Sequence, residues 1–104
     1  MDKSEALTIA KRYAQAIKLN FDCKKVILFG SYAKGNFNEQ SDIDIAVVFN
    51  EYSNGLDIQL KLMQIRRKID SRIEPHPFTE KDFTVSNPLV NEILKYGQNI
   101  ELNI

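Results

Sequence analysis

Two aspartates, Asp42 and Asp44, lie one residue apart at the start of an apolar, β-branched run that continues to Phe49. In a strand, residues two apart point to the same face with Cα atoms about 7 Å apart, so both carboxylates can reach one site. Like charges this close repel each other unless a cation lies between them, and hard oxygen ligands suit Mg²⁺ or Mn²⁺. The pair therefore predicts a divalent-metal site, although an Asp-x-Asp pair taken alone is also common as surface residues that cap a strand.

A Gly-Ser turn precedes the aspartates in the sequence. Gly30 allows the chain to leave the apolar run 26–29 sharply, and Ser31 can offer its hydroxyl and amide to an anion at the start of a short helix. Gly35 ends that helix, and a polar loop then leads to Asp42. Read alone, the segment is an ordinary strand-turn-helix with Ser31 as the helix N-cap. Together with the aspartates it predicts a site for a metal-bound nucleotide.

The predicted nucleotide-binding residues lie in and around this turn: Gly30, Ser31, Lys34 and Ser41. Lys34 can supply a positive charge for a triphosphate, and a solvated lysine on a turn is an equally good interpretation of it. Its charge would have to act locally, because the whole chain has 14 basic and 14 acidic residues and so no global attraction for nucleic acid or an anionic membrane.

The elements that must position these residues follow from the hydrophobic pattern. Apolar residues at three-and-four spacing behind Ser4 predict an amphipathic helix over 3–19, and the apolar runs 26–29 and 43–49 predict strands covered by helices. A helix is predicted from about 56 to near Ser71, followed by an extended segment over 72–76 whose prolines, Pro75 and Pro77, place its end at a sheet edge or in an irregular loop. The last predicted elements are a helix from Pro88 closed by Gly97 and a strand over Ile100, Leu102 and Ile104. This order predicts the α/β (α+β) class, with a mixed sheet of about four strands packed against helices.

Length and composition set the remaining limits. A chain of 104 residues predicts one domain over 1–104 with a single hydrophobic core. The one cysteine, Cys23, cannot form an internal disulfide and is expected to be a buried small hydrophobe, and no signal sequence is evident, so we expect a cytoplasmic protein. The longest apolar run is far too short to span a bilayer.

The spacing Gly30-Ser31, ten residues, then Asp42-Ile43-Asp44 resembles the pattern of the DNA polymerase beta-like nucleotidyltransferase superfamily. Within that superfamily, Gly-Ser-Tyr-Ala-Lys-Gly and Ser-Asp-Ile-Asp-Ile-Ala-Val are most similar to the minimal, MntA-type nucleotidyltransferases. The likeness covers nearly the whole chain, and it implies a palm fold of the polymerase beta type.

The resemblance also implies a third carboxylate on a neighbouring strand, beyond the helix that follows Asp44. Glu74 is the candidate, with Asp70 and Glu80 as competitors. The catalytic and metal-binding set it implies is therefore Asp42, Asp44 and Glu74. Aspartate is common at the third position in the superfamily, so glutamate is a departure.

Two further residues near the implied site are open to more than one interpretation. Tyr32 stands where many relatives have arginine, which leaves Lys34 as the nearby positive charge. His76 lies between two prolines near Glu74, where a structural role is the commoner one and a metal or proton-shuttle role is the alternative.

The activity that the resemblance implies is Mg²⁺-dependent transfer of AMP from ATP to a hydroxyl, with Mn²⁺ as a possible substitute. Minimal nucleotidyltransferases are commonly paired with a helical HEPN toxin and act as antitoxins by adenylylating a toxin tyrosine, so the implied partner is a HEPN-type protein. Two alternatives remain open: a non-catalytic antitoxin or nucleotide sensor that acts by contact, and a transferase for a small molecule such as an aminoglycoside. The absence of a helical acceptor domain argues against the small molecule.

Overall fold

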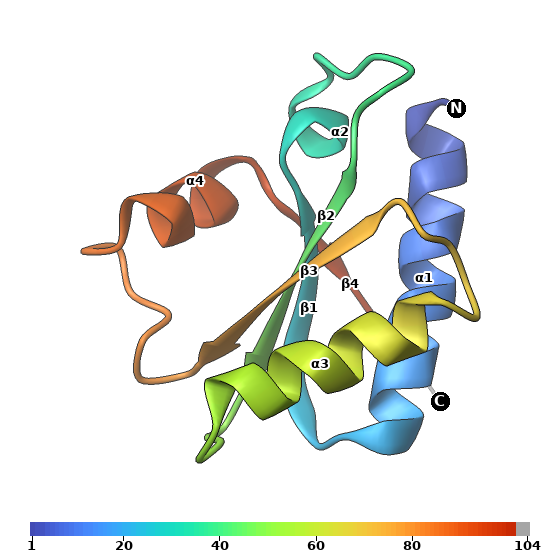
Figure 1. Ribbon diagram of the computed structural model, residues 1–104. Helices are drawn as coiled ribbons and strands as arrows, with labels where there is room; N and C mark the ends of the chain where they lie inside the picture. The colour runs from blue at the N-terminus through green and yellow to red at the C-terminus, as the bar shows by residue number, and fades with distance from the viewer. Residues whose placement is uncertain (102–104) are drawn as a thin grey trace.

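Helices and strands follow one another in the predicted order in a computed structural model that describes residues 1–101 (Figure 1). The elements are α1 (Lys3–Asn20), β1 (Cys23–Phe29), α2 (Ser31–Lys34), β2 (Ile43–Phe49), α3 (Gly55–Arg66), β3 (Ile73–Thr79), α4 (Pro88–Tyr96) and β4 (Gln98–Ile100). They form one α+β domain, as predicted.

The strands form one mixed sheet in the order β3-β2-β1-β4. β1 is antiparallel to β2 and to β4, whereas β2 and β3 are parallel and are connected through α3. The register places Phe29 opposite Asp44 across β1 and β2, and Asp44 opposite Glu74 across β2 and β3. Residues far apart in sequence are therefore brought together near the start of β2.

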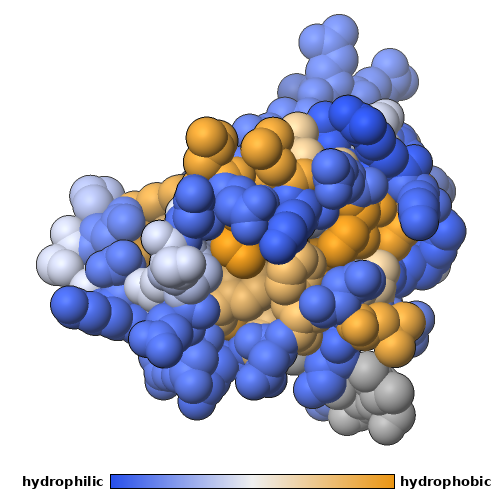
Figure 2. Space-filling model, turned by 60° about the horizontal axis from the view of Figure 1, so that its bottom comes forward, coloured by the Kyte–Doolittle hydropathy of each residue, from blue (hydrophilic) through white to orange (hydrophobic). Residues whose placement is uncertain are grey.

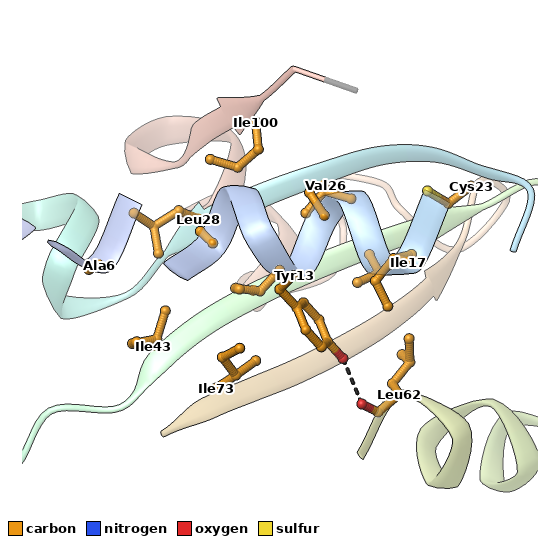
Figure 3. Close-up of a cluster of buried hydrophobic side chains, with 14 of the residues drawn as sticks. Ala6, Tyr13, Ile17, Cys23, Val26, Leu28, Ile43, Leu62, Ile73 and Ile100 are labelled. Atoms are coloured by element: carbon orange, nitrogen blue, oxygen red, sulfur yellow. Dashed lines mark hydrogen bonds between the residues drawn. The ribbon is translucent and has the colours of Figure 1, made fainter. Parts of the chain in front are cut away.

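The two faces of the sheet have different covers. Ile43, Ile45 and Val47 of β2 point to the face that α1 and α3 cover, and this larger core is shown in Figure 3. There the buried Tyr13 hydroxyl of α1 donates a 2.8 Å hydrogen bond to the Leu62 carbonyl of α3. Burial raises the pKa of this phenol, so it remains a neutral donor.

The opposite face is covered by α4 over a smaller apolar core. Val90 and Ile93 of α4 pack there against the sheet, together with Ala46 and Val48 of β2. Side chains alternate along a strand, so Asp44, which neighbours Ala46 at i+2, lies on this second face. The polar Asp44 at the start of β2 therefore lies on the sheet face that α4 covers.

Strand β3 is an edge strand, as its prolines predict. Pro75 and Pro77 have no backbone N–H to offer to another chain. Side chains outside the sheet donate to the carbonyls along this edge: Arg66 to Ile73, Gln59 to Pro75 and Tyr52 to Pro77, at 3.0, 3.2 and 3.5 Å. These contacts protect the edge against pairing with another strand.

Several element boundaries differ from those predicted. The N-cap of α1 is Asp2, whose carboxylate accepts from the Glu5 amide, and not Ser4. α3 ends at Arg66 and not near Ser71, because the chain turns there and the Arg66 guanidinium binds carbonyls of the following segment. β1 begins three residues before Val26, at Cys23, and β3 extends beyond residue 76 to Thr79.

Other boundaries are as predicted. α4 begins at Pro88 and is followed by Gly97, and Cys23 is buried. Of the predicted last strand, Ile100 lies in β4, whereas Leu102 and Ile104 lie outside the described residues.

No helix within residues 1–101 has the length and apolar character needed to cross a bilayer. The surface is mainly polar with apolar side chains between, as Figure 2 shows for the face seen from below Figure 1. On α3, Leu56 and Leu60 are 71% and 55% exposed, one helical turn apart.

Candidate functional site

The Gly30-Ser31 turn requires a glycine at its first position. Gly30 has φ 74° and ψ −152°, a combination that is essentially restricted to glycine. A Cβ at this residue would also overlap Oδ2 of Asp44 and lie 3.1 Å from its Cγ. The turn and the Asp44 carboxylate are therefore in direct contact.

The short helix after the turn has glycine at both of its caps. Gly30 and not Ser31 occupies the N-cap position, so Ser31 is the first helical residue. Gly35 has φ 88° and its N–H donates to the Ser31 carbonyl, which closes α2 as predicted. Ser31 thus lies directly beside the glycine that contacts Asp44.

The three predicted carboxylates, called here the carboxylate cluster (Asp42, Asp44 and Glu74), lie together at the start of β2 and β3. Glu74 is paired with Asp44 in the sheet register, and its carboxyl lies close to that of Asp42, which precedes β2. Hydrogen bonding to Asp42, followed by partial burial and by the charges of Asp42 and Asp44, raises the pKa of the Glu74 carboxyl. The cluster is thus a concentration of negative charge that favours either a proton or a cation.

The two competitors for the third position are engaged elsewhere. Asp70 accepts hydrogen bonds from Arg72 at 2.7 and 2.9 Å, and these bonds lower the pKa of its carboxyl. Glu80 follows the other end of β3 and forms a 3.5 Å ion pair with Lys24. Glu74 is the candidate that the fold brings to the aspartates.

His76 also reaches the cluster, which the sequence alone did not establish. Its Nε2 lies 3.1 Å from Oδ1 of Asp44. Its ring contacts the Phe29 ring edge to face, with the two ring centres 4.9 Å apart. The available signal was the alternation along β3, which places His76 on the same face as Glu74.

The other predicted nucleotide-binding residues have protein partners. Lys34 Nζ donates to Oε1 of Glu92 on α4 at 2.9 Å and lies 5.0 Å from the centre of the Tyr96 ring. This hydrogen bond, together with the Glu92 charge, raises the pKa of Lys34. Ser41 accepts from the Asn38 amide at 2.9 Å and so stabilises the loop before Asp42.

Tyr32, at the position where relatives have arginine, is a packing residue. It is buried and stacks on Phe37 with ring centres 4.7 Å apart. The positive charge nearest to the turn in sequence is therefore that of Lys34.

The donor chemistry of the cluster fits a hard divalent cation, because all three side chains offer carboxylate oxygens. Within residues 1–101, however, no three metal-ligating side chains are gathered closely enough to form a completed site. Holding a cation would require these carboxylates to come closer together than they lie here.

Comparison with known families identifies the chain. A model described as a nucleotidyltransferase domain matches residues 10–100, nearly the whole sequence. The chain belongs to the nucleotidyltransferase family. It is therefore a nucleotidyltransferase, and its turn and carboxylate cluster lie within the matched region.

Two of the relatives in sequence share one assignment. A Methanocaldococcus jannaschii protein assigned as a protein adenylyltransferase is 29% identical over 102 residues, which span 92% of this chain and 99% of the relative. A second protein of that organism with the same assignment is 41% identical over 56 residues, spanning 51% of this chain and 56% of the relative.

Solved structures confirm the fold. A nucleotidyltransferase structure from Sulfolobus solfataricus has a TM-score of 0.67 at 23% identity, covering 93% of this chain and 80% of that chain. A toxin-antitoxin structure with AMP-PNP has a TM-score of 0.66 at 20% identity, covering 89% and 73%. A complex of a tri-AMPylated Shewanella oneidensis HEPN toxin with its MNT antitoxin has a TM-score of 0.64 at 18% identity, covering 94% and 73%.

Proposed function

We propose that this nucleotidyltransferase moves AMP from ATP to a hydroxyl of a protein, namely a tyrosine of a HEPN-type helical partner, and thereby acts as an antitoxin. The observation that carries the proposal is the contact of the Gly30 turn with Asp44, which is paired with Glu74 on the neighbouring strand. The similar proteins described above support the choice of AMP and of a protein acceptor.

In this proposal the turn binds the triphosphate. The Gly30 backbone and the Ser31 hydroxyl and amide contact phosphate oxygens, because α2 begins there and a bulky side chain is absent. Lys34 adds a positive charge after exchanging its bond to Glu92 for a phosphate oxygen. Ser41 positions the loop that leads to the aspartates.

The carboxylate cluster would hold Mg²⁺ or Mn²⁺, which would neutralise phosphate charge and lower the pKa of the acceptor hydroxyl. As an alternative to binding the metal, Glu74 would act as the general base that receives the hydroxyl proton. The acceptor oxygen forms a bond to the α-phosphorus, the bond to the bridging oxygen breaks, and pyrophosphate leaves.

The acceptor comes from another molecule in this proposal. In residues 1–101, α4 is the helix that covers the sheet face with Asp44, and its apolar core is small. A partner can therefore approach the carboxylate cluster beside α4. A cytoplasmic location stays a prediction from the sequence.

The test is the intact mass of the partner after incubation with this protein and Mg-ATP. Wild-type protein should add one or more AMP units to a HEPN-type protein encoded beside it. The variant with both Asp42→Ala and Asp44→Ala should add none. No added mass with wild type, or the same gain with the double variant, would contradict the enzymatic proposal.

A specific observation also favours the alternative of neutralisation by contact. Leu56 and Leu60 form an exposed apolar stripe on α3, a surface suited to another protein. The variant with Leu56→Ser and Leu60→Ser separates the two functions from the double alanine variant. Neutralisation that survives the loss of both aspartates and disappears with the serine variant would assign the function to contact.

A further inference from the structure

We propose that His76 is a positioning residue for Asp44, which fixes the orientation of that carboxylate through a hydrogen bond to Oδ1. The inference deepens the proposed function, because Asp44 is one of its metal-binding residues. It rests on contacts made from three adjacent strands, described below.

The position of His76 in the sheet allows the imidazole to reach Asp44. His76 is paired with Ala46 in the β2–β3 register, and Asp44 is two residues earlier on the same face of β2. Ala46 has only a methyl group, so the space above it can accept the imidazole. Phe29 of β1, which is paired with Asp44, contacts the imidazole ring edge to face.

The hydrogen bond has a defined direction. An ionised carboxylate can only accept, so Nε2 of His76 must donate its proton to Oδ1 across 3.1 Å. Both side chains are about three-quarters buried, with 27% and 25% of their surface exposed, so solvent competes only in part for this contact.

The second oxygen of Asp44 is fixed by the turn. Oδ2 lies so close to Gly30 that a Cβ there would overlap it. With Oδ1 bonded to His76 on one side and Oδ2 against Gly30 on the other, the carboxylate has one orientation, and Oδ2 is the oxygen at the Gly30-Ser31 turn. Removing the hydrogen bond from His76 would allow the Asp44 carboxylate to rotate. The affinity for a cation bound between the carboxylate cluster and the Gly30-Ser31 turn would then fall.

A first experiment tests the contact without any metal. The chain has one histidine, so the imidazole nitrogen NMR signals belong to His76 once any tag is removed. For the neutral imidazole, we expect the Nε2-protonated form in wild type and a mixture of tautomers in Asp44→Ala. A proton on Nδ1 alone in wild type, or identical spectra for both proteins, would overturn the inference.

A second experiment measures Mn²⁺ affinity from the signal of free Mn²⁺ in electron paramagnetic resonance. We expect His76→Ala to weaken Mn²⁺ binding about tenfold, the lower end of what the loss of an outer-shell partner causes. His76→Gln should retain most of the affinity, because its amide can donate from a similar place. Equal loss in both variants, or no loss in either, contradicts positioning through the donor. Wild type that binds no Mn²⁺ would contradict the proposed metal site, and the nitrogen spectrum would still decide the contact.

Discussion

Gly30→Ala is the perturbation that tests most sharply how the turn and the carboxylate cluster are joined. Two costs arise at this position. The backbone conformation, with φ 74° and ψ −152°, is costly for alanine by about 1–3 kcal/mol. The new Cβ must also displace Asp44, and overpacking of this kind costs about 1–3 kcal/mol more.

We therefore expect Gly30→Ala to lower the free energy of unfolding by about 2–6 kcal/mol, a large part of the total for a small domain. Gly35→Ala is the matched control, because Gly35 also has positive φ, 88°, but nothing lies within 4 Å of its Cβ position. It should cost only the left-handed backbone term, about 1–2 kcal/mol.

Urea denaturation in metal-free buffer measures these differences, and a double-mutant cycle with Asp44→Ala isolates the contact. With the carboxylate removed, the cost of Gly30→Ala should fall towards its backbone term of about 1–3 kcal/mol, because only Cβ of residue 44 then stays close, at 3.2 Å. Mn²⁺ binding should be lost in Gly30→Ala and retained in Gly35→Ala. An unchanged cost of Gly30→Ala in the Asp44→Ala background would refute the contact between turn and carboxylate.

Three further predictions follow from other contacts. Lys34→Met should weaken ATP binding several-fold, as measured by equilibrium dialysis. Glu92→Gln should not weaken it, because Glu92 competes with phosphate for the Lys34 ammonium. Equal losses of ATP affinity in the two variants would contradict a phosphate contact of Lys34. The raised pKa of Glu74 makes its contribution favourable below its ordinary value of 4.5 and progressively lost as pH rises through the folded-state value. Without metal, Glu74→Gln should therefore gain stability relative to wild type between acid and neutral pH, and a constant difference in urea midpoints would refute the shift. Tyr13→Phe should lower the free energy of unfolding by about 1 kcal/mol by removing the bond to Leu62 (Figure 3), and an unchanged urea midpoint would contradict that role.

Much of the site could be predicted because its spacing is local. The ten residues between the turn and Asp42 contain only the rest of the short helix and a loop, so Gly30 and Asp44 become neighbours once the flanking strands β1 and β2 pair. The family resemblance implied a third carboxylate and named Glu74 as the candidate, but Asp70 and Glu80 stayed open until the register of β3 was known.

The remaining features depend on contacts between distant segments. The end of α3 at Arg66 is set by its bonds to carbonyls at Ser71 and Ile73, which no helix pattern encodes. The contact of His76 with Asp44 depends on the register of β3 against β2. The partner of Lys34 is Glu92 on α4, 58 residues later in the chain. Such pairings arise from the tertiary fold and leave no periodic signal in the sequence.

The measurement that tests the central claim most directly follows two radioactive labels in ATP. The reaction contains this protein, its HEPN-type partner and Mg²⁺, with ATP labelled at either the α- or the γ-phosphate. Transfer of AMP predicts that the α label becomes attached to the partner, that the γ label leaves in pyrophosphate, and that Asp42→Ala with Asp44→Ala abolishes both. Attachment of the γ label, or of neither label, would contradict nucleotidyl transfer to the partner.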